Sequence, residues 1–400
     1  MAEAIRFHIQ NDLPTGDLGL LWLDLEKRAD ITFFLSWDWM NAWIGELGEC
    51  PPVVIGEVSG ALVLLGLVVP RYRREAGVIR VNGLSLHATG ERTKDCIAIE
   101  FNGFLVDREW SGRAEREAVA YLLRKAIVGG RRRDELHIVG MLEDQAVAIT
   151  PPGTLVQMPY RKPSWRVDLR SVRSAGKAYL DTLSANTRQQ IRRSVRLYEA
   201  AGRLTAEWAT DAGTALDWLG GLKELHQRQW QARGKPGGFA SAFFEQFQRR
   251  LIADCVPRGT AELIRVSRDG KPIGYLYNLI RDGHVLAFVS GFLYEDDNRL
   301  KPGLVCHALA IEQHVQRGDS IYDFMAGETR YKSNLGQPGP VFVYLLLQRP
   351  TPMTRAERML RRGWERVQHL RSLRGAYAQP GERDQMAAAE QQTRPTGRQK

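Results

Sequence analysis

The segment from His284 to Gly336 constrains the fold of this chain more than any other. It opens with a strand-like run that ends at Phe292 and continues through a loop with basic residues. Pro302 suits a first helical position, because its missing N–H would have no partner there. Gly318 is typical of a helix end, and a second strand is predicted at Ser320–Met325. The segment therefore predicts a strand–helix–strand unit.

The turn at the start of this helix has the composition of a phosphate site. The first N–H groups of a helix lack intrahelical partners, and the helix dipole favours an anion. Gly303 lets the backbone approach closely, while Arg299 and Lys301 add positive charge. An ordinary strand–helix turn with solvated charges is the alternative, since short glycine motifs also occur by chance.

Three motifs together resemble one family. They are RLKPGL at residues 299–304, HQRQWQARGKPGGF at 226–239 and YDFMAGETRYK at 322–332. They resemble the GNAT acyltransferases of the branch typified by the cellulose-biosynthesis protein CelD, which are distant relatives of the Fem-type peptidyltransferases. The resemblance covers about Ser184 to Gly336, and Leu304 departs from the small residue of the family's pyrophosphate loop. It implies an acyl-CoA co-substrate, held by Ser290, Gly291, Phe292, Arg299, Lys301, Gly303 and Leu304.

The length of 400 residues predicts two domains rather than one. The order of predicted helices and strands in the first half is similar to that in the second. Together with the family resemblance, this predicts an α+β fold of two GNAT-like mixed α/β halves in tandem. Each half is expected to be a twisted, mainly antiparallel sheet flanked by helices. We expect an N-terminal half at residues 1–160, a C-terminal half carrying the acyltransferase at 161–350, and a tail at 351–400.

Particular segments of this layout are predicted as follows. Trp39 and Trp43 lie on one face of a helix that begins after Ser36, and we expect both in the core. Cys96–Phe101 is predicted to be a strand and Ser174–Thr182 a helix. Gln157–Asp168 contains two prolines and is expected to be extended and to cross between the halves.

The charge of the chain is concentrated in its tail. Of 56 Lys and Arg and 46 Asp and Glu, 11 and 5 lie beyond Pro350, which leaves a nearly balanced body of 45 and 41. We therefore expect no nucleic-acid partner. The four scattered cysteines suit a reducing compartment, and neither a signal peptide nor a membrane span is expected, so we predict a cytoplasmic protein.

Two helical motifs are candidate binding or catalytic sites. Arg188 and Arg192 begin a row at four-residue spacing that continues at Arg196, and such a row would bind an anionic substrate or a phosphate of CoA. A solvated helix face is the alternative. His226 and Trp230 share a face of another helix, where His226 would act as a general base or pack as an ordinary buried histidine.

The turn after the second strand of the segment carries a third set of candidates. Tyr331 or Lys332 would donate a proton or stabilise an oxyanion, and Asp323 or Glu328 would bind the acceptor. Lys332 is the first choice for the chemical step. A surface turn with an ion pair is the alternative. The eight histidines form no metal-site pattern with the acidic residues, so no metal is expected.

The function expected from these features is acyl transfer from acyl-CoA to an amine or a hydroxyl group, in exopolysaccharide or cellulose synthesis. Fem-type aminoacyl transfer to a cell-wall precursor is one alternative, and a non-catalytic GNAT-like partner of a polysaccharide synthase is another. The tail is predicted to form a basic amphipathic helix at Met353–Leu373 and to be disordered from Gln379. It would dock on its own body, on a synthase partner or on an anionic membrane surface.

Overall fold

The computed structural model describes residues 3–75, 79–128, 130–327 and 330–359. The strands of the N-terminal half are β1 (Arg6–Gln10), β2 (Val53–Val58), β3 (Ala61–Glu75), β4 (Ile79–Leu86), β5 (Leu105–Val106), β6 (Ile127–Val128), β7 (Arg131–Arg132), β8 (Glu135–Leu142) and β9 (Leu155–Gln157). Its helices are α1 (Thr15–Glu26), α2 (Trp37–Leu47), α3 (Arg113–Arg124) and α4 (Glu143–Ala148).

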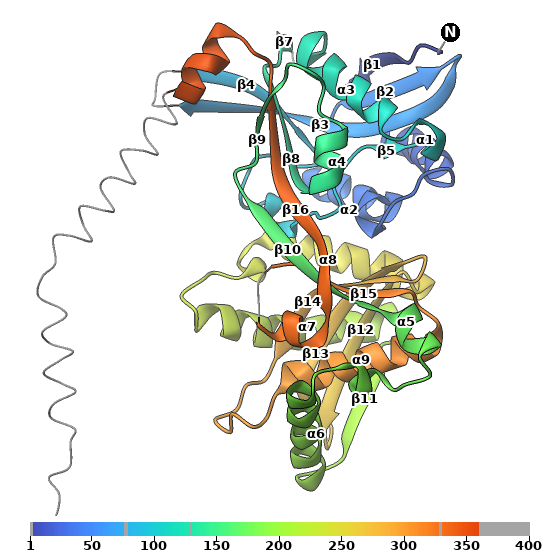
Figure 1. The fold of residues 1–400 in the computed structure, drawn as a ribbon, viewed down its shortest axis with the longest axis vertical. Helices are drawn as coiled ribbons and strands as arrows, with labels where there is room; N and C mark the ends of the chain where they lie inside the picture. The colour runs from blue at the N-terminus through green and yellow to red at the C-terminus, as the bar shows by residue number, and fades with distance from the viewer. Residues whose placement is uncertain (1–2, 76–78, 129, 328–329, 360–400) are drawn as a thin grey trace, which may run out of the picture. The chain divides into compact units, whose positions relative to one another are not determined.

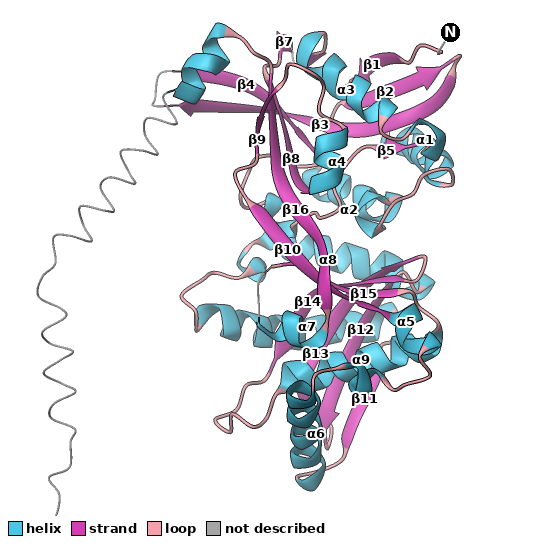
Figure 2. Ribbon diagram, viewed as in Figure 1, coloured by secondary structure: helices cyan, strands magenta, loops and turns pink. Residues whose placement is uncertain are grey.

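The C-terminal half contributes the remaining elements. Its strands are β10 (Arg161–Asp168), β11 (Leu204–Trp208), β12 (Ala261–Arg268), β13 (Lys271–Arg281), β14 (His284–Phe292), β15 (Ile321–Ala326) and β16 (Gln337–Gln348). Its helices are α5 (Leu169–Ser174), α6 (Ala185–Ala200), α7 (Ala212–Gln231), α8 (Ala242–Cys255), α9 (Pro302–Arg317) and α10 (Arg330–Leu335). Figures 1 and 2 show these elements along the chain.

Most of the described strands belong to one mixed sheet. Its order is β1-β2-β3-β4-β8-β16-β10-β15-β14-β13-β12-β11, with β5 paired to β3 and β9 paired to β16. The same arrangement occurs in both halves. Four neighbouring strands are followed by a helix and by a fifth strand parallel to the fourth, as β11 to β14, α9 and β15, and as β1 to β4, α3 and β8. The predicted tandem of two GNAT-like halves is therefore confirmed.

Two strands join the halves into one sheet. β10 lies between β15 and β16 and is antiparallel to both. β16 continues past β10 to pair with β8 of the N-terminal half. The segment predicted to cross between the halves is therefore extended, and it is bonded on both edges.

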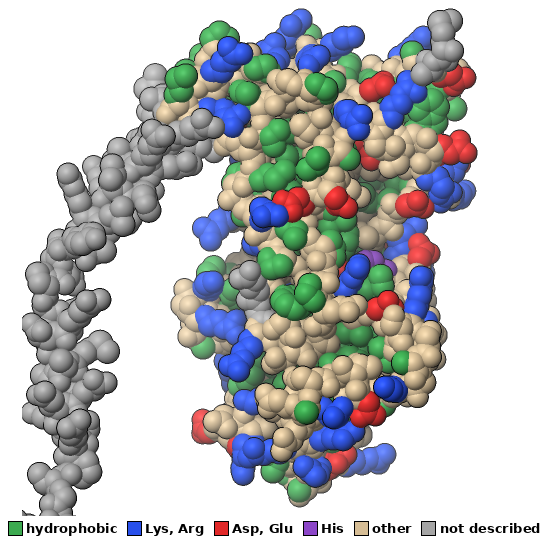
Figure 3. Space-filling model, viewed as in Figure 1, with side chains coloured by type: hydrophobic (Ala, Val, Ile, Leu, Met, Phe, Trp, Pro, Cys, Tyr) green, Lys and Arg blue, Asp and Glu red, His purple; other side chains and the backbone are tan. Residues whose placement is uncertain are grey.

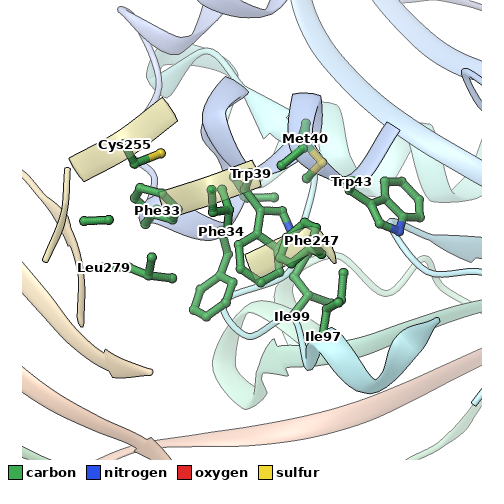
Figure 4. Packing of buried hydrophobic residues seen from close by; sticks show 14 of the residues in the cluster. Phe33, Phe34, Trp39, Met40, Trp43, Ile97, Ile99, Phe247, Cys255 and Leu279 are labelled. Carbon is green, nitrogen blue, oxygen red and sulfur yellow. The ribbon is translucent and has the colours of Figure 1, made fainter. Parts of the chain in front are cut away.

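The halves also share a hydrophobic core. Helix α2 packs against α8, and the Trp39 and Phe247 ring centroids lie 4.7 Å apart in an edge-on contact. Trp39 and Trp43 are both buried, as expected. Figure 4 shows these rings beside Ile97 and Ile99, which are buried in the same cluster. A second core on the other face of the sheet packs α5, α6 and α9 against β12 to β15.

Two predictions about local structure are wrong. Cys96–Phe101 is not a strand, because a single 3-10 turn ends at Ile97 and both Ala98 and Phe101 adopt left-handed backbone angles with φ of 56° and 50°. The helix expected at Ser174–Thr182 is not formed, because α5 ends at Ser174 and the rest of the range holds only a 3-10 turn at Tyr179–Thr182. The strand β11 was not predicted, and it forms the edge of the sheet beside β12.

The chain divides into two compact units by its contacts. The larger unit holds Met1–Arg71 and Asn82–Arg349 and so includes most of both halves. The smaller unit comprises Tyr72–Val81 and the chain from Pro350, of which residues 350–359 are described and 352–359 are helical. The rest of the predicted tail lies outside the described residues. Within the described part of the chain, no helix is both long enough and apolar enough to cross a membrane.

Candidate functional site

The gap between β14 and β15 is the centre of the candidate site. The two parallel strands are paired only from His284 to Leu286 and from Ile321 to Asp323. Beyond this point β14 contains a bulge, because its pairing with β13 shifts around Phe288. A bulge bends its strand away from the regular direction. The ends of β14 and β15 therefore separate and form the two walls of a gap.

Helix α9 begins beside the end of β14. Pro302 is its first residue, and Gly318 ends it in the left-handed conformation, as the sequence predicts. The Lys301 N–H donates to Ser194 Oγ of α6 at 2.9 Å, so α6 packs directly against this helix start. A Cβ atom on Gly303 would lie 3.2 Å from the Phe292 ring, which explains why this close approach needs a small residue.

The other residues predicted to hold acyl-CoA have different surroundings. Arg299 forms an ion pair with Asp297, with nitrogen–oxygen distances of 2.7 to 3.0 Å, and half of its side chain is exposed. Leu304 is buried in the core, so its side chain faces away from any phosphate at the helix start. Gly291 faces α7, since a Cβ atom there would lie 2.6 Å from Leu222 O.

Two arginines of the predicted row on α6 pair with one acidic residue. Arg188 and Arg192 both pair with Asp181, at 3.9 Å and 3.0 Å. In Figure 3 the Lys and Arg side chains around α6 stand beside acidic side chains. The hydrogen bonds from Arg299 lower the pKa of the Asp297 carboxyl group to about 2, and the charge of Arg193 on α6 adds a smaller lowering.

His226 lies on α7 against the end of β14. Its Nδ1 lies 3.1 Å from Ser290 O, and because a carbonyl oxygen only accepts, Nδ1 carries the proton. Nε2 is buried, with no hydrogen-bond partner among the described residues. Burial lowers the pKa of His226, so the ring is neutral at pH 7. Trp230 lies tilted beside the ring and Phe239 meets it edge-on.

The end of β15 carries the other predicted catalytic residues. Asp323 is buried, accepts a hydrogen bond from the Met325 N–H at 2.7 Å and lies 3.3 Å from His284 Nε2. Lys332 is also buried, and its Nζ donates to Met325 O at 3.2 Å and to Ala326 O at 2.8 Å. Burial lowers the pKa of Lys332. His226 and Lys332 thus contact opposite walls of the gap.

Aromatic rings occupy the space near α10. The Tyr331 ring stacks on His307 of α9 at 5.6 Å, and Phe292 and Phe324 meet the same imidazole edge-on. His307 Nδ1 bonds to the Tyr322 hydroxyl at 2.9 Å, and burial lowers the pKa of His307 to about 3. Tyr331 therefore borders the gap from the α9 side.

Glu100 was missed by the sequence predictions. It belongs to the N-terminal half, yet its Oε2 accepts the Ala326 N–H at 2.9 Å. The segment around it was predicted to be a strand, and nothing in its local pattern indicates a contact with β15. Glu328, predicted to bind the acceptor, lies outside the described residues.

A cavity of about 400 Å³ lies near α10 and the start of α6. Its lining includes Tyr179, Thr187, Asn334 and Gly336, but none of the predicted catalytic or cofactor-binding residues. Among the described residues, no group of three or more His, Cys, Asp or Glu side chains is arranged to hold a metal ion.

Comparisons with known proteins identify a known domain in the C-terminal half. Residues 185–333 match the family model of the acetyltransferase (GNAT) domain. This range includes α6 to α9, β15 and Lys332. No curated protein sequence matches the chain.

Similar solved structures cover most of this chain. FemX has 10% sequence identity and a TM-score of 0.54, with 85% of this chain and 96% of that chain covered. The C-terminal domain of a protein assigned as lysylphosphatidylglycerol synthetase from Agrobacterium fabrum has 12% identity, a TM-score of 0.49 and coverage of 87% and 95%. A tandem GNAT protein from the clavulanic acid biosynthesis pathway has 14% identity, a TM-score of 0.42 and coverage of 87% and 100%. By the repeated order of strands and helix in its two halves and by the family model, the chain has a tandem GNAT-like fold whose C-terminal half matches the acetyltransferase (GNAT) domain.

Proposed function

We propose that this protein is an acyl-CoA-dependent acyltransferase whose reaction takes place in the C-terminal half. The observation that carries the proposal is the gap between the separating ends of β14 and β15, with the start of α9 beside it. The extended arm of a CoA thioester would lie in this gap, between the two strand ends. The adjacent helix start offers unpaired N–H groups to its pyrophosphate.

The chain's own residues suit this donor. The hydrogen bond from the Val305 N–H to Lys301 O closes the first turn of α9. Gly303 and Leu304 come before Val305, so their N–H groups have no partner within the helix. Lys301, Arg299 and Arg193 bring positive charge to the same helix start, and Asp297 sets the position of Arg299. Ser290 and Phe292 form the β14 wall along which the arm would lie.

Residues on the two walls would supply the chemistry. Nucleophilic attack on a thioester needs stabilisation of the carbonyl oxygen and a proton for the leaving thiolate. Lys332 and Tyr331, on the β15 and α9 side, are suited to these steps. His226 Nε2 is unprotonated and is suited to accept a proton if its surroundings open. The acceptor would be an amine or a hydroxyl group, bound with the help of Asp323.

The resemblance of the sequence motifs to the CelD-like branch supports a sugar acceptor in exopolysaccharide synthesis. Two other functions remain as alternatives. The similarity of the whole fold to FemX favours aminoacyl transfer to a cell-wall precursor as the second candidate. A non-catalytic partner of a polysaccharide synthase is favoured by buried Leu304 and by the pairing of Arg299 with Asp297.

Isothermal titration calorimetry with CoA and acetyl-CoA tests the proposal. The wild-type chain is expected to bind both, and Gly303→Glu to weaken binding by at least ~100-fold, or about 2.8 kcal/mol. Gly303→Ala adds the same Cβ contact with Phe292 without a charge and is expected to lose much less. Gly220→Glu places the same side chain on an open face of α7, with no atom near its Cβ, and is the matched control.

The outcomes separate the candidate functions. Unchanged affinity in a folded Gly303→Glu variant would place the CoA site elsewhere. If the wild-type chain binds neither CoA nor acetyl-CoA, acyl-CoA chemistry is excluded, and the FemX-like and non-catalytic alternatives take its place.

A further inference from the structure

A segment of the N-terminal half reaches the site of the C-terminal half. It runs from His87, after β4, to Gly103 and is here called the bridging segment. It contains only the short 3-10 turn Asp95–Ile97. Its first part is tied by Asp95, whose carboxylate accepts hydrogen bonds from Thr89 N, Thr89 Oγ1 and Gly90 N at 2.7 to 2.9 Å.

Buried contacts fix the course of this segment. Ile97 and Ile99 lie in the core that both halves share, beside Phe247 (Figure 4). Gly140 of β8 allows the chain to pass directly over it, because a Cβ atom there would lie only 2.2 Å from Ile99 O. The alternation of buried Ile97 and Ile99 leaves Glu100 turned away from the shared core.

Asn102 holds the end of the bridging segment between two strands. Its Nδ2 donates to Leu86 O of β4 and to Val139 O of β8, at 3.0 Å each, and His87 Nδ1 lies 3.0 Å from its Oδ1. The pairing of β4 with β8 ends at Ser85 and His137. The Asn102 side-chain amide lies beyond this point and bonds to both strands. This position in the N-terminal half corresponds to the β14–β15 gap in the C-terminal half. In the N-terminal half, the chain itself therefore occupies the equivalent space.

Glu100 is thereby placed at the end of β15. Its Oε2 accepts the Ala326 N–H, while Lys332 Nζ donates to Ala326 O. The backbone N–H of Ala326 is thus bound by a carboxylate of the N-terminal half, and its backbone oxygen by an ammonium group of the C-terminal half. The backbone is strained on both sides of this contact, since Ala98, Phe101 and Met325 all have left-handed φ angles of 50° to 61°. Strain of this kind is concentrated at functional sites.

The surroundings of Glu100 distinguish it from other buried carboxylates of the chain. Glu262 accepts hydrogen bonds from Asn278 and Arg317 and lies 2.7 Å from His314 Nε2. Glu100 uses only Oε2 among the described residues, and the residue is partly exposed. Glu100 Oε1 is therefore the oxygen that we assign to the acceptor in the proposal below.

The charged and titratable groups around Glu100 set its proton affinity. They are Lys332 of α10, Asp323 of β15, Lys162 of β10 and Tyr160. Burial raises the pKa of Glu100 to about 7, against the lowering by the Ala326 N–H and by the charges of Lys332 and Lys162. A carboxylate with this proton affinity accepts a proton efficiently near neutral pH.

We propose that the N-terminal half completes the acyl-transfer site, and that Glu100 is its general base. The inference rests on the proposed acyltransferase function. The acceptor nitrogen or oxygen attacks the thioester carbonyl and forms the new C–N or C–O bond. Glu100 takes the proton that the acceptor loses, and the C–S bond breaks to release the CoA thiolate, which takes a proton from Tyr331 or Lys332.

The test compares Glu100→Gln with the wild-type chain, using acetyl-CoA and two acceptors. Gln keeps the size of the side chain and an oxygen for the Ala326 N–H. The amine of glucosamine is largely protonated near neutral pH and depends on a base to lose its proton. The amine of hydroxylamine is already neutral there and depends less on a base. With glucosamine we expect kcat/KM of Glu100→Gln to be about 100-fold or more below that of the wild type. We also expect the wild-type increase of kcat/KM with pH near 7 to be absent in the variant. With hydroxylamine we expect a much smaller loss.

Three controls accompany this comparison. Glu91→Gln changes an exposed carboxylate of the bridging segment that pairs with Lys94, and it is expected to leave turnover unchanged. Glu100→Asp keeps a carboxylate and is expected to recover part of the activity. Calorimetry with acetyl-CoA is expected to give the same affinity for all variants, within a few fold.

Stability separates a base from a structural ion pair. Because the folded pKa of Glu100 is raised, its stability contribution is complete below the unfolded value and is lost as pH rises through about 7. Glu100→Gln is therefore expected to be at least as stable as the wild type at pH 8.5, and a lower melting temperature there would identify a structural ion pair and overturn the proposal.

The remaining outcomes are also decisive. Equal loss with both acceptors, or a pH limb near 7 that persists in Glu100→Gln, overturns the assignment of Glu100. Binding of acetyl-CoA by the wild type with no turnover of either acceptor also overturns it. Failure of the wild type to bind acetyl-CoA refutes the proposed function instead.

Discussion

Replacing Asn102 by Asp tests whether the bridging segment is held by the gap between β4 and β8. Asp has nearly the same shape but cannot donate to Leu86 O and Val139 O. Asn102 is fully buried, so each carbonyl left without a donor costs about 1–3 kcal/mol. We expect the two together to lower the free energy of unfolding by about 2–6 kcal/mol. This is a large part of the ~5–15 kcal/mol that holds a typical protein folded.

The new carboxyl group adds a dependence on pH. An ionised carboxylate would face two carbonyl oxygens, so the folded pKa of the new Asp is expected to be raised. Its contribution to stability is then retained below the unfolded pKa of about 3.9 and is lost as pH rises, by up to ~1.4 kcal/mol per pH unit until the folded pKa is passed. The variant should therefore be more stable, relative to wild type, at pH 5.5 than at pH 8.

Urea denaturation followed by circular dichroism measures both effects. Asn102→Leu is the control, because it loses the same hydrogen bonds without adding a charge, and its deficit should not depend on pH. Since the segment also carries Glu100, turnover should fall in Asn102→Asp, while acetyl-CoA affinity in the C-terminal half is retained. A deficit below about 0.5 kcal/mol at pH 8, within the range of ordinary surface substitutions, would refute the reasoning.

Three further predictions follow from particular groups. Lys332→Met is expected to slow turnover by ~10²–10³ with acetyl-CoA affinity nearly unchanged, and Tyr331→Phe is expected to slow turnover less. Steady-state kinetics and calorimetry on both variants check this. If Tyr331→Phe slows turnover more than Lys332→Met, the two residues exchange roles. Burial lowers the pKa of His87 to about 4 and of His307 to about 3, so their stability contribution is present above pH 6.5 and is lost as pH falls toward these values, by at most ~1.4 kcal/mol per unit for each group. The raised pKa of Glu100 opposes this loss between pH 6.5 and 4.5, whereas the raised pKa of His314 acts above pH 6.5. The urea midpoint is therefore measured in Glu100→Gln, where a flat midpoint between pH 6.5 and 4.5 would contradict the prediction. A chain that ends at Met359 keeps the described helix at 352–359 and is expected to retain acyl transfer, as measured by thiol release from acetyl-CoA. Loss of activity in the folded truncated chain would assign the tail a part in the reaction.

Local signals in the sequence determined several elements of this protein. Pro302 and Gly318 bound α9, because one residue lacks an N–H and the other tolerates a left-handed angle. Ser36 and Asp211 cap their helices through their side chains, as N-terminal Ser and Asp residues do. These features depend on a few neighbouring residues, and a single sequence is sufficient to read them. The strand–helix–strand unit around the candidate site was predictable for the same reason.

Tertiary structure alone decided which distant groups meet. The insertion of β10 between β15 and β16 depends on bonds across more than 150 residues, which no local pattern encodes. Within the bridging segment, Cys96–Phe101 is predicted from sequence to be a strand. Asn102 and the buried Ile97 and Ile99 hold it instead in an irregular course with left-handed angles at Ala98 and Phe101. Glu100 therefore reaches Ala326 from 226 residues away. Its raised pKa comes from burial between the halves, and burial arises only when the chain has folded.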